Sequence, residues 1–371
     1  MAASQSSIAK ELGLARMTVS RALRGENGIA EETRQRIFAA AREAGLPLPP
    51  SRKPANDRAL QHVLCAMGLG GEGPSHPVRM LDGMRRGVQE CASELLRCDW
   101  VDIALGITEW PAPVTRRQVD GVLLVGSGER GSTCQTPCPV PQVYLFQGPP
   151  HADRVVVDDF GGGLLLGAHL AAMGHRQIAF IGPDTRMAHA RLAGIRTGLE
   201  HACRAGAQPA DRATLTPVVI LIPSRGGQEP EFMELLLAGE TNPAAIRRRF
   251  TAIACYNDWF AVHTIQYLTA RGLRVPEDLS ITGFDNVTPS WYDGPKLTTC
   301  AVPLEELGAE ATRFLYWRIE HPHAIRRTLM LETELMKGET VGELKIEEAL
   351  AKPPVLQAEG SGFGVQVTFP A

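Results

Sequence analysis

The stretch from Ser4 to Leu23, SQSSIAKELGLARMTVSRAL, most constrains what this chain can fold into. Its apolar residues recur at helical spacing on both sides of Gly13, a residue type that tolerates the backbone angles of a tight turn. The pattern predicts two short helices joined by a turn, the second with a polar face. Helical pairs of this kind enter the major groove of DNA. A surface hairpin that only caps a larger domain is the alternative interpretation.

The residues that follow complete a small domain. Arg24–Asn27 form a polar loop, and residues 31–44 carry apolar side chains at helical spacing. Three short helices can bury one small core between them. We therefore predict a three-helix helix-turn-helix headpiece over residues 1–46.

A proline-rich linker separates this headpiece from the rest of the chain. Prolines disfavour a helix interior, so residues 47–60 are predicted to be a hinge. Residues 1–60 hold ten Lys or Arg and six Asp or Glu, a charge of +4, although the whole chain carries −3. A basic head on an acidic body suits a protein that contacts phosphate with one end only. The prolines are Pro47, Pro49, Pro50 and Pro54.

From His62 onward, predicted strands alternate with predicted helices. This alternation indicates α/β architecture with parallel sheets covered on both faces. The alternating region is longer than one sheet usually accommodates, so we expect two lobes over residues 61–341. Ligands of such folds bind at the carboxyl ends of the strands and between lobes. Residues 342–371 are expected to be a tail whose role cannot be predicted.

Several classes of protein are disfavoured by what the sequence lacks. It has no apolar run of membrane-spanning length and no secretory signal, so we expect a cytoplasmic protein without membrane contact. Its eight cysteines include no C-x-x-C pair and no zinc-finger spacing, so no metal or other cofactor is expected. No hydrolase or phosphate-loop motif occurs.

Two alternatives to a DNA-binding regulator were weighed. Gly68, Gly70 and Gly73 form a G-x-G-x-x-G after a predicted strand, as in an NAD-dependent oxidoreductase. That fingerprint requires a helix to begin at once, but Pro74 and Pro77 intervene. A solute-binding protein would share the two lobes, but it would need an export signal and no headpiece. We therefore expect no enzymatic activity.

Seven motifs together resemble the lactose-repressor (LacI/GalR) family of bacterial regulators. The resemblance covers residues 4–341, and the order and spacing of the motifs make it specific. The motifs are IAKELGLARMTVSRAL at 8–23, IAEETRQRI at 29–37, GHRQIAFIG at 174–182, RLAGIRTGL at 191–199, YND at 256–258, GLRVPEDLSITGFDN at 272–286 and PKLTTC at 295–300.

The resemblance implies an architecture and a mode of action. The family joins a DNA-binding headpiece to two periplasmic-binding-protein-like lobes that hold a small-molecule effector. A homodimer reads a pseudo-palindromic operator in double-stranded DNA. Here the amino lobe would comprise residues 61–158 and 285–321, and the carboxyl lobe residues 159–284 and 322–341. Repression controlled by a small metabolite, which could be a saccharide, is the implied function.

The resemblance also assigns DNA contacts. Arg16, Met17 and Arg21 occupy positions that read base edges, and an Arg there favours guanine. Ser4, Thr18, Ser20 and Thr33 match phosphate contacts, although helix capping alone would explain the serines and Thr33. The family hinge inserts a Leu into the minor groove; no Leu stands at that position here, so Arg52 and Lys53 would contact phosphate only.

The effector site matches the family less closely. Arg191, Asn257 and Asp285 match positions that hydrogen-bond the effector, although Asn257 could simply cap a helix and Asp285 could simply end a strand. Phe146 stands where the family usually has an Asp. With Leu69 it would make the site more apolar than a typical sugar site, and Arg79 could face an anionic group.

Overall fold

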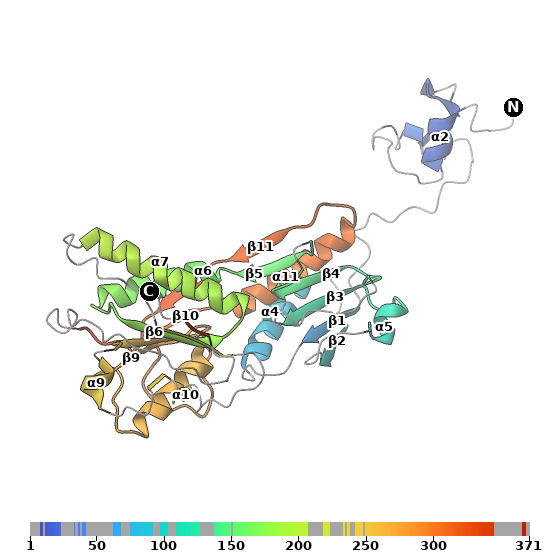
Figure 1. The fold of residues 1–371 in the computed structure, drawn as a ribbon. Helices are drawn as coiled ribbons and strands as arrows, with labels where there is room; N and C mark the ends of the chain where they lie inside the picture. The colour runs from blue at the N-terminus through green and yellow to red at the C-terminus, as the bar shows by residue number, and fades with distance from the viewer. Residues whose placement is uncertain are drawn as a thin grey trace. The chain divides into compact units, whose positions relative to one another are not determined.

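The computed structural model divides the chain into two compact units, Met1–Ala59 and Leu60–Ala371, and each is described by itself (Figure 1). No helix within the described part of the chain is long and apolar enough to cross a membrane. The structure describes residues 8–9, 12–23, 33, 36–37, 39–41, 62–67, 75–91, 97–102, 109–126, 137–149, 151–206, 218–222, 233, 236–237, 242–247, 249–344 and 366–368.

The first unit is built around helix α2 (Arg16–Leu23). Residues 8–9 and 12 are helical before the turn at Gly13, where φ is +65°, and residues 33, 36–37 and 39–41 are helical after α2. These segments lie where the sequence predicts the first and third helices. Their buried side chains form one small core of Ile8, Ala9, Val19, Ile37, Ala40 and Ala41.

The second unit contains a six-stranded parallel sheet that forms the amino lobe. Its order is β11-β5-β4-β3-β1-β2, and helices α4 (Ser75–Cys91), α5 (Ala112–Thr115) and α11 (Leu304–Glu320) accompany it (Figure 1). The strands are β1 (His62–Met67), β2 (Arg97–Asp102), β3 (Gly121–Gly126), β4 (Gln142–Phe146), β5 (Arg154–Val157) and β11 (Thr328–Leu331).

A five-stranded sheet, in the order β13-β7-β6-β8-β9, forms the carboxyl lobe. Four of its strands are parallel, as predicted, whereas β13 from the tail pairs antiparallel with β7. The strands are β6 (Ile178–Pro183), β7 (Val218–Ile222), β8 (Ala252–Cys255), β9 (Ser280–Thr282) and β13 (Gln366–Thr368). The helices are α6 (Asp159–Ala172), α7 (Arg186–Gly206), α9 (Pro243–Arg247) and α10 (Asp258–Thr269).

One predicted lobe boundary is wrong. The sequence interpretation placed residues 322–341 in the carboxyl lobe, but β11 pairs in parallel with β5 of the amino lobe. The chain therefore leaves the first sheet after Leu331, and β12 (Glu334–Met336) then pairs with β10 (Thr299–Ala301). The buried carboxylate of Asp153 holds β11 in place, because it accepts hydrogen bonds from Arg318, Arg326 and the backbone of Arg327.

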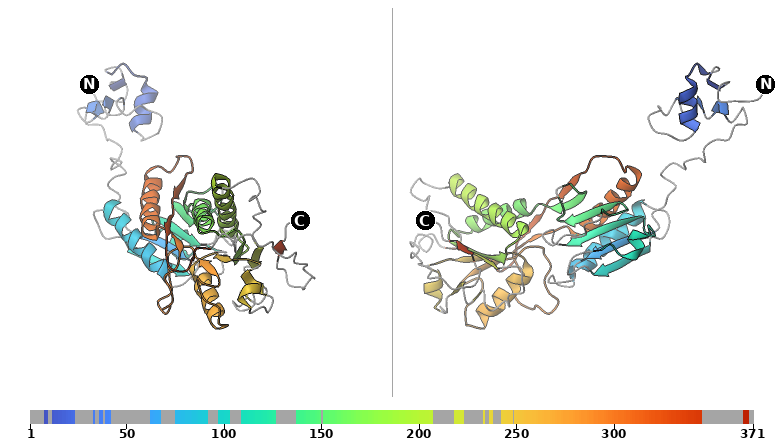
Figure 2. Two further views of the ribbon diagram at one scale, coloured as in Figure 1. Left: turned by 90° about the vertical axis from the view of Figure 1, so that its left-hand side faces the viewer. Right: turned by 45° about the vertical axis from the view of Figure 1, so that its right-hand side comes forward.

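Glycines allow helices α6 and α7 to pack at backbone contact, and Figure 2 shows the two green helices side by side. A Cβ atom on Gly163 would lie 2.1 Å from the carbonyl oxygen of Arg191, and one on Gly194 would lie 2.1 Å from that of Phe160. Neither contact is sterically tolerable, so no other residue type fits at this separation. The close approach fixes where α7 presents Arg191.

His175 links Thr251 of the carboxyl lobe to Gly342, which follows the last crossing of the chain between the lobes. Its Nδ1 lies 2.9 Å from the Thr251 hydroxyl and its Nε2 lies 3.0 Å from the Gly342 carbonyl oxygen. A carbonyl oxygen only accepts, so Nε2 donates the hydrogen bond to Gly342. Burial lowers the pKa of the His175 imidazole to about 4.

This pKa predicts a loss of stability in mild acid. The unfolded chain binds a proton at His175 below about pH 6.5 and the folded chain does not, so up to about 3 kcal/mol of unfolding free energy is lost between pH 6.5 and pH 4. Urea denaturation at pH 7, 6 and 5 should show a smaller pH dependence in His175→Gln, whereas His201→Gln, at an exposed site, should behave as wild type. Equal slopes in His175→Gln and wild type would refute the assignment.

Candidate DNA-binding and effector sites

Helix α2 presents two of the three residues that the sequence assigns to base reading. Val19 is fully buried in the headpiece core, whereas Arg16 and Met17 are exposed, Met17 to 65%. The preceding turn sets this orientation, because the backbone N–H of Leu14 donates to the Ala9 carbonyl before α2 begins. An exposed cation beside an exposed apolar side chain offers both kinds of contact that base edges accept.

The other predicted DNA contacts are only partly described. Thr18 and Ser20 lie on α2 and Thr33 lies in a later helical segment, all three half-buried. Arg21 belongs to α2, but its side chain is outside the described set. Ser4, Arg52 and Lys53 lie outside the described residues.

Arg191 is the centre of the predicted effector site. It is 4% exposed, and its Nε donates to Asp159 at 2.8 Å while its Nη1 donates to the Tyr256 carbonyl at 2.6 Å. Its Nη2 lies 3.4 Å from a carboxylate oxygen of Asp285. The guanidinium also stacks on two rings, 3.8 Å from the Phe284 centroid and 4.5 Å from that of Tyr256.

The electrostatics of this cluster favour a charged arginine between two carboxylates. Burial opposes the charge on Arg191, but Asp285 and Asp159 outweigh it and raise the pKa of the guanidinium. Burial raises the pKa of Asp159, against the lowering effect of Arg191, and the nearby Asp285 adds to the increase. Two carboxylates and one guanidinium sum to −1, so the cluster repels a further anion.

Asp285 is held in a backbone conformation that most residues avoid, with φ at 99°. Its N–H donates to the Cys300 carbonyl at 2.7 Å, and its own carbonyl accepts from Val302 at 3.3 Å. Such strain persists only where surrounding bonds determine the conformation, and it is common at ligand sites. Strand β9 ends at Thr282, so Asp285 lies beyond the strand and does not itself end it.

Asn257 acts as a helix cap in the structure. Its side-chain oxygen accepts from the N–H of Phe260 at 3.1 Å and so begins α10. This is the capping alternative that the sequence left open. Asn257 is buried directly beside Tyr256, whose carbonyl accepts a hydrogen bond from Arg191.

Phe146 ends β4 in a strained turn. Its φ is 66°, and the N–H of Gln147 donates back to the Leu145 carbonyl at 2.9 Å, which closes a three-residue γ-turn. Positive φ is rare for a bulky side chain. The turn places a half-buried aromatic ring at the carboxyl end of the strand.

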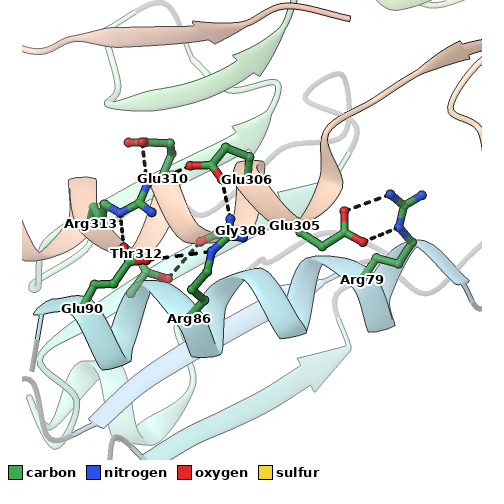
Figure 3. A network of polar contacts seen from close by, with 9 residues as sticks. All are labelled: Arg79, Arg86, Glu90, Glu305, Glu306, Gly308, Glu310, Thr312 and Arg313. Carbon is green, nitrogen blue, oxygen red and sulfur yellow. Dashed lines mark hydrogen bonds and ion pairs between the residues drawn. The ribbon is translucent and has the colours of Figure 1, made fainter. Parts of the chain in front are cut away.

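Arg79 does not offer a free cation to an anionic effector. Its Nε and Nη2 donate to the two carboxylate oxygens of Glu305 at 2.6 and 2.9 Å (Figure 3). Its Nη1 donates to the Asn286 carbonyl at 3.3 Å. The expectation that Arg79 faces an anionic group is therefore wrong, because Glu305 already neutralises it. Leu69 lies outside the described residues.

The sequence interpretation missed three members of the Arg191 cluster: Asp159, Tyr256 and Phe284. Asp159 had a detectable signal, because it opens a helix directly after a strand and so lies at the carboxyl edge of the sheet. Tyr256 and Phe284 lie within matched motifs, beside Asn257 and Asp285. No group of three or more His, Cys, Asp or Glu within the described ranges could hold a metal ion.

Replacing Arg191 should be severely destabilising. Arg191→Gln leaves the carboxylates of Asp159 and Asp285 buried without their cation, and we expect a loss of about 3–5 kcal/mol in the free energy of unfolding at pH 7.5. The loss should shrink at pH 5, because one carboxyl then takes up a proton. Urea titrations would measure it, with Arg196→Gln on the exposed face of α7 as the matched control. Equal stability of both variants would contradict the described cluster.

Comparison with known proteins covers both units. Residues 6–46 match the family described as bacterial regulatory proteins, lacI family, and residues 168–341 match the periplasmic binding protein-like domain. The HTH-type transcriptional repressor PurR of Mannheimia succiniciproducens is 26% identical over 348 residues, 91% of this chain and 98% of that protein. The HTH-type transcriptional regulator DegA of Bacillus subtilis is 29% identical over 320 residues, 82% of this chain and 88% of that protein.

Solved structures share the fold. A LacI family transcriptional regulator from Enterococcus faecium with bound ribose is 25% identical, with a TM-score of 0.59, and the match covers 76% of this chain and all of that one. The lac repressor dimer bound to operator is 20% identical, with a TM-score of 0.54, over 91% of this chain and 99% of that one. The chain therefore carries a lacI-family helix-turn-helix domain followed by a periplasmic-binding-protein-like domain, and the relatives it resembles are HTH-type transcriptional regulators.

Proposed function

We propose that this protein is a transcriptional repressor that binds operator DNA as a homodimer. A small metabolite that binds between its lobes raises or lowers its affinity for the operator. The observation that carries the proposal is α2, which buries Val19 and presents Arg16 and Met17 to solvent. The named relatives are HTH-type repressors and regulators, and the lac repressor was solved as a dimer on its operator. Such a protein works on DNA in the cytoplasm and catalyses no reaction.

Each part of the chain is proposed to have its own role. Residues 1–46 bind DNA, residues 47–60 form the hinge, and the lobes from residue 61 to 341 bind the effector. A two-fold symmetric dimer presents two α2 helices to two half-sites, so the operator is pseudo-palindromic. With Pro54 in the hinge, Arg52 and Lys53 contribute phosphate contacts rather than a wedge between base pairs.

The effector is proposed to be a neutral metabolite that combines hydroxyl groups with an apolar face. The cluster of Arg191, Asp159 and Asp285 carries a net negative charge, and Arg79 is neutralised by Glu305. Both features disfavour a phosphate or carboxylate ligand. Donors and acceptors on Arg191, Asn257 and Asp285 suit hydroxyls. Ribose in the Enterococcus faecium relative is such a neutral ligand, and Phe146 supplies an apolar surface here.

A gel-shift assay tests the central proposal. Purified protein is titrated at low salt into a fragment of the promoter of its own operon, with and without candidate metabolites. Retardation that a metabolite weakens or strengthens is expected. The proposal fails if the protein retards no DNA fragment at low salt, because sequence-independent phosphate contacts alone should give detectable binding there.

Arg16 should carry sequence preference rather than general affinity. Arg16→Ala is expected to lose about 1–3 kcal/mol of discrimination between the operator and a scrambled fragment, while weak binding to both remains. Fluorescence anisotropy with both fragments measures the ratio. The control is Arg36→Ala, an exposed arginine of the same unit, which should leave the ratio unchanged. A uniform loss for both fragments in Arg16→Ala would make Arg16 a phosphate contact.

The charge of the site predicts which metabolites bind. In thermal-shift assays of neutral metabolites paired with their phosphate esters, such as ribose with ribose 5-phosphate, any rise in melting temperature should come from the neutral member. Wild type and Phe146→Asp are compared, and the variant should respond more strongly to ligands with many hydroxyls. A phosphate ester that stabilises the protein while its neutral parent does not would contradict the proposed class.

A further inference from the structure

Arg79 bonds simultaneously to two parts of the core that are far apart in sequence. Two of its nitrogens bind both oxygens of Glu305, at the start of α11 (Figure 3). The third binds the backbone carbonyl of Asn286. The bidentate geometry fixes the guanidinium plane more tightly than a single contact would. Glu305 responds accordingly, since its hydrogen bonds from Arg79 lower the pKa of its carboxyl.

Asn286 directly follows Asp285, the carboxylate that faces Arg191. Both residues have positive φ, 56° and 99°. The next N–H, of Val287, donates to the carboxylate of Asp258 at 2.6 Å. The segment 285–287 is therefore held from the amino lobe by Arg79 and from the carboxyl lobe by Asp258. A shift of either lobe at this crossing must change one of these bonds.

Arg79 is also the first member of a row of ion pairs that follows helices α4 and α11 (Figure 3). Arg86 pairs with Glu306, and Arg313 pairs with Glu90 at 2.7 Å and with Glu306 at 3.0 Å. Beneath the row, a Cβ on Gly87 would lie 2.7 Å from the Ala309 carbonyl oxygen. Backbone contact and ion pairs together make α4 and α11 one stiff body about 25 Å long.

The two helices connect opposite edges of the amino-lobe sheet. Because β1 and β2 are parallel, α4 must run back from the carboxyl edge to the amino edge, where β1 begins at His62. Helix α11 runs the same way, since Glu305 and Arg313 pair with early and late residues of α4. Near the end of α11, Arg318 is anchored to the buried Asp153 ahead of β5.

We propose that Arg79 is a positioning residue that couples the effector site to the amino edge of this lobe through the α4–α11 pair. By holding the Asn286 carbonyl it sets the conformation of Asp285, and by holding Glu305 it passes any movement of the crossing to both helices. Its role is communication, not effector contact. The proposal rests on the proposed function, in which effector binding alters operator affinity.

A purely structural salt bridge is the competing explanation. The side chains of Arg79 and Glu305 are 35% and 40% exposed. Exposed ion pairs contribute little to stability. Such a pair would influence local stability but not the response of one site to occupation of the other. The experiment therefore measures communication, and coupling is reciprocal, so operator DNA can serve as the probe in place of the effector.

Hydrogen exchange followed by mass spectrometry tests the proposal on the full chain. Wild type, Arg79→Gln and the control Arg85→Gln are compared with and without the operator fragment found by gel shift; Arg85 lies on α4 and pairs with Asp82. We expect DNA to change exchange at residues 283–287 by about fivefold or more in wild type and Arg85→Gln. Arg79→Gln should bind DNA with similar affinity and lack that change.

Three results would overturn the proposal. One is an unaltered DNA response at residues 283–287 in Arg79→Gln, and another is no response in wild type. The third is loss of DNA binding by Arg79→Gln together with a lower free energy of unfolding, because Arg79 would then only stabilise the fold. If wild type binds no DNA at all, the proposed function has failed instead.

In that case, hydrogen exchange of the protein without DNA still tests whether Arg79 couples residues 283–287 to the α4–α11 pair. Arg79→Gln should accelerate exchange at residues 313–320, at the far end of α11, as well as at residues 283–287. Acceleration confined to the neighbours of Arg79 would reject the coupling.

Discussion

One buried cation, Arg191, holds together segments at two of the crossings between the lobes. Its guanidinium binds Asp159 at the start of α6, just after the first crossing between lobes, and Asp285 at the second crossing. Two carboxylates that would repel each other in a buried site are joined only because the cation lies between them. Arg191, which we propose contacts the effector, therefore also sets the geometry of both crossings.

Both lobes pack a pair of helices in the same way, although the side chains on the surfaces of the two pairs differ. In each lobe, the helix after the first strand packs against a helix that follows a crossing between the lobes. These pairs are α4 with α11 and α7 with α6. Glycines bring both pairs to backbone contact. Side-chain packing alone would leave rotamers free to adjust, whereas backbone contact fixes the separation. In the amino lobe a row of ion pairs adds fixed orientation to this fixed separation, which makes α4 and α11 suited to transmit movement.

Local pattern predicted the architecture, but not contacts between distant residues. Alternation of strands and helices predicted the two sheets, and helical spacing placed Val19 inward and Arg16 outward. The strand β11 is short, and its sheet is decided by Asp153, which pairs with Arg318 across 165 residues. Arg79 seemed available for an anion because its partner Glu305 lies 226 residues away. Nor does any sequence signal reveal the γ-turn at Phe146, since bulky residues rarely adopt it.

The placement of polar and apolar groups determines what kind of ligand could act on this protein. Hydrogen-bonding groups gather around Arg191 in the carboxyl lobe, whereas the amino lobe supplies the ring of Phe146 and, in Arg79 and Glu305, a pair that neutralises itself. A ligand that contacted one lobe only would bind equally well whatever the position of the other lobe. Such a ligand shifts no equilibrium, however tightly it binds. An effective effector must therefore contact both lobes, with hydroxyls on one side and an apolar face on the other.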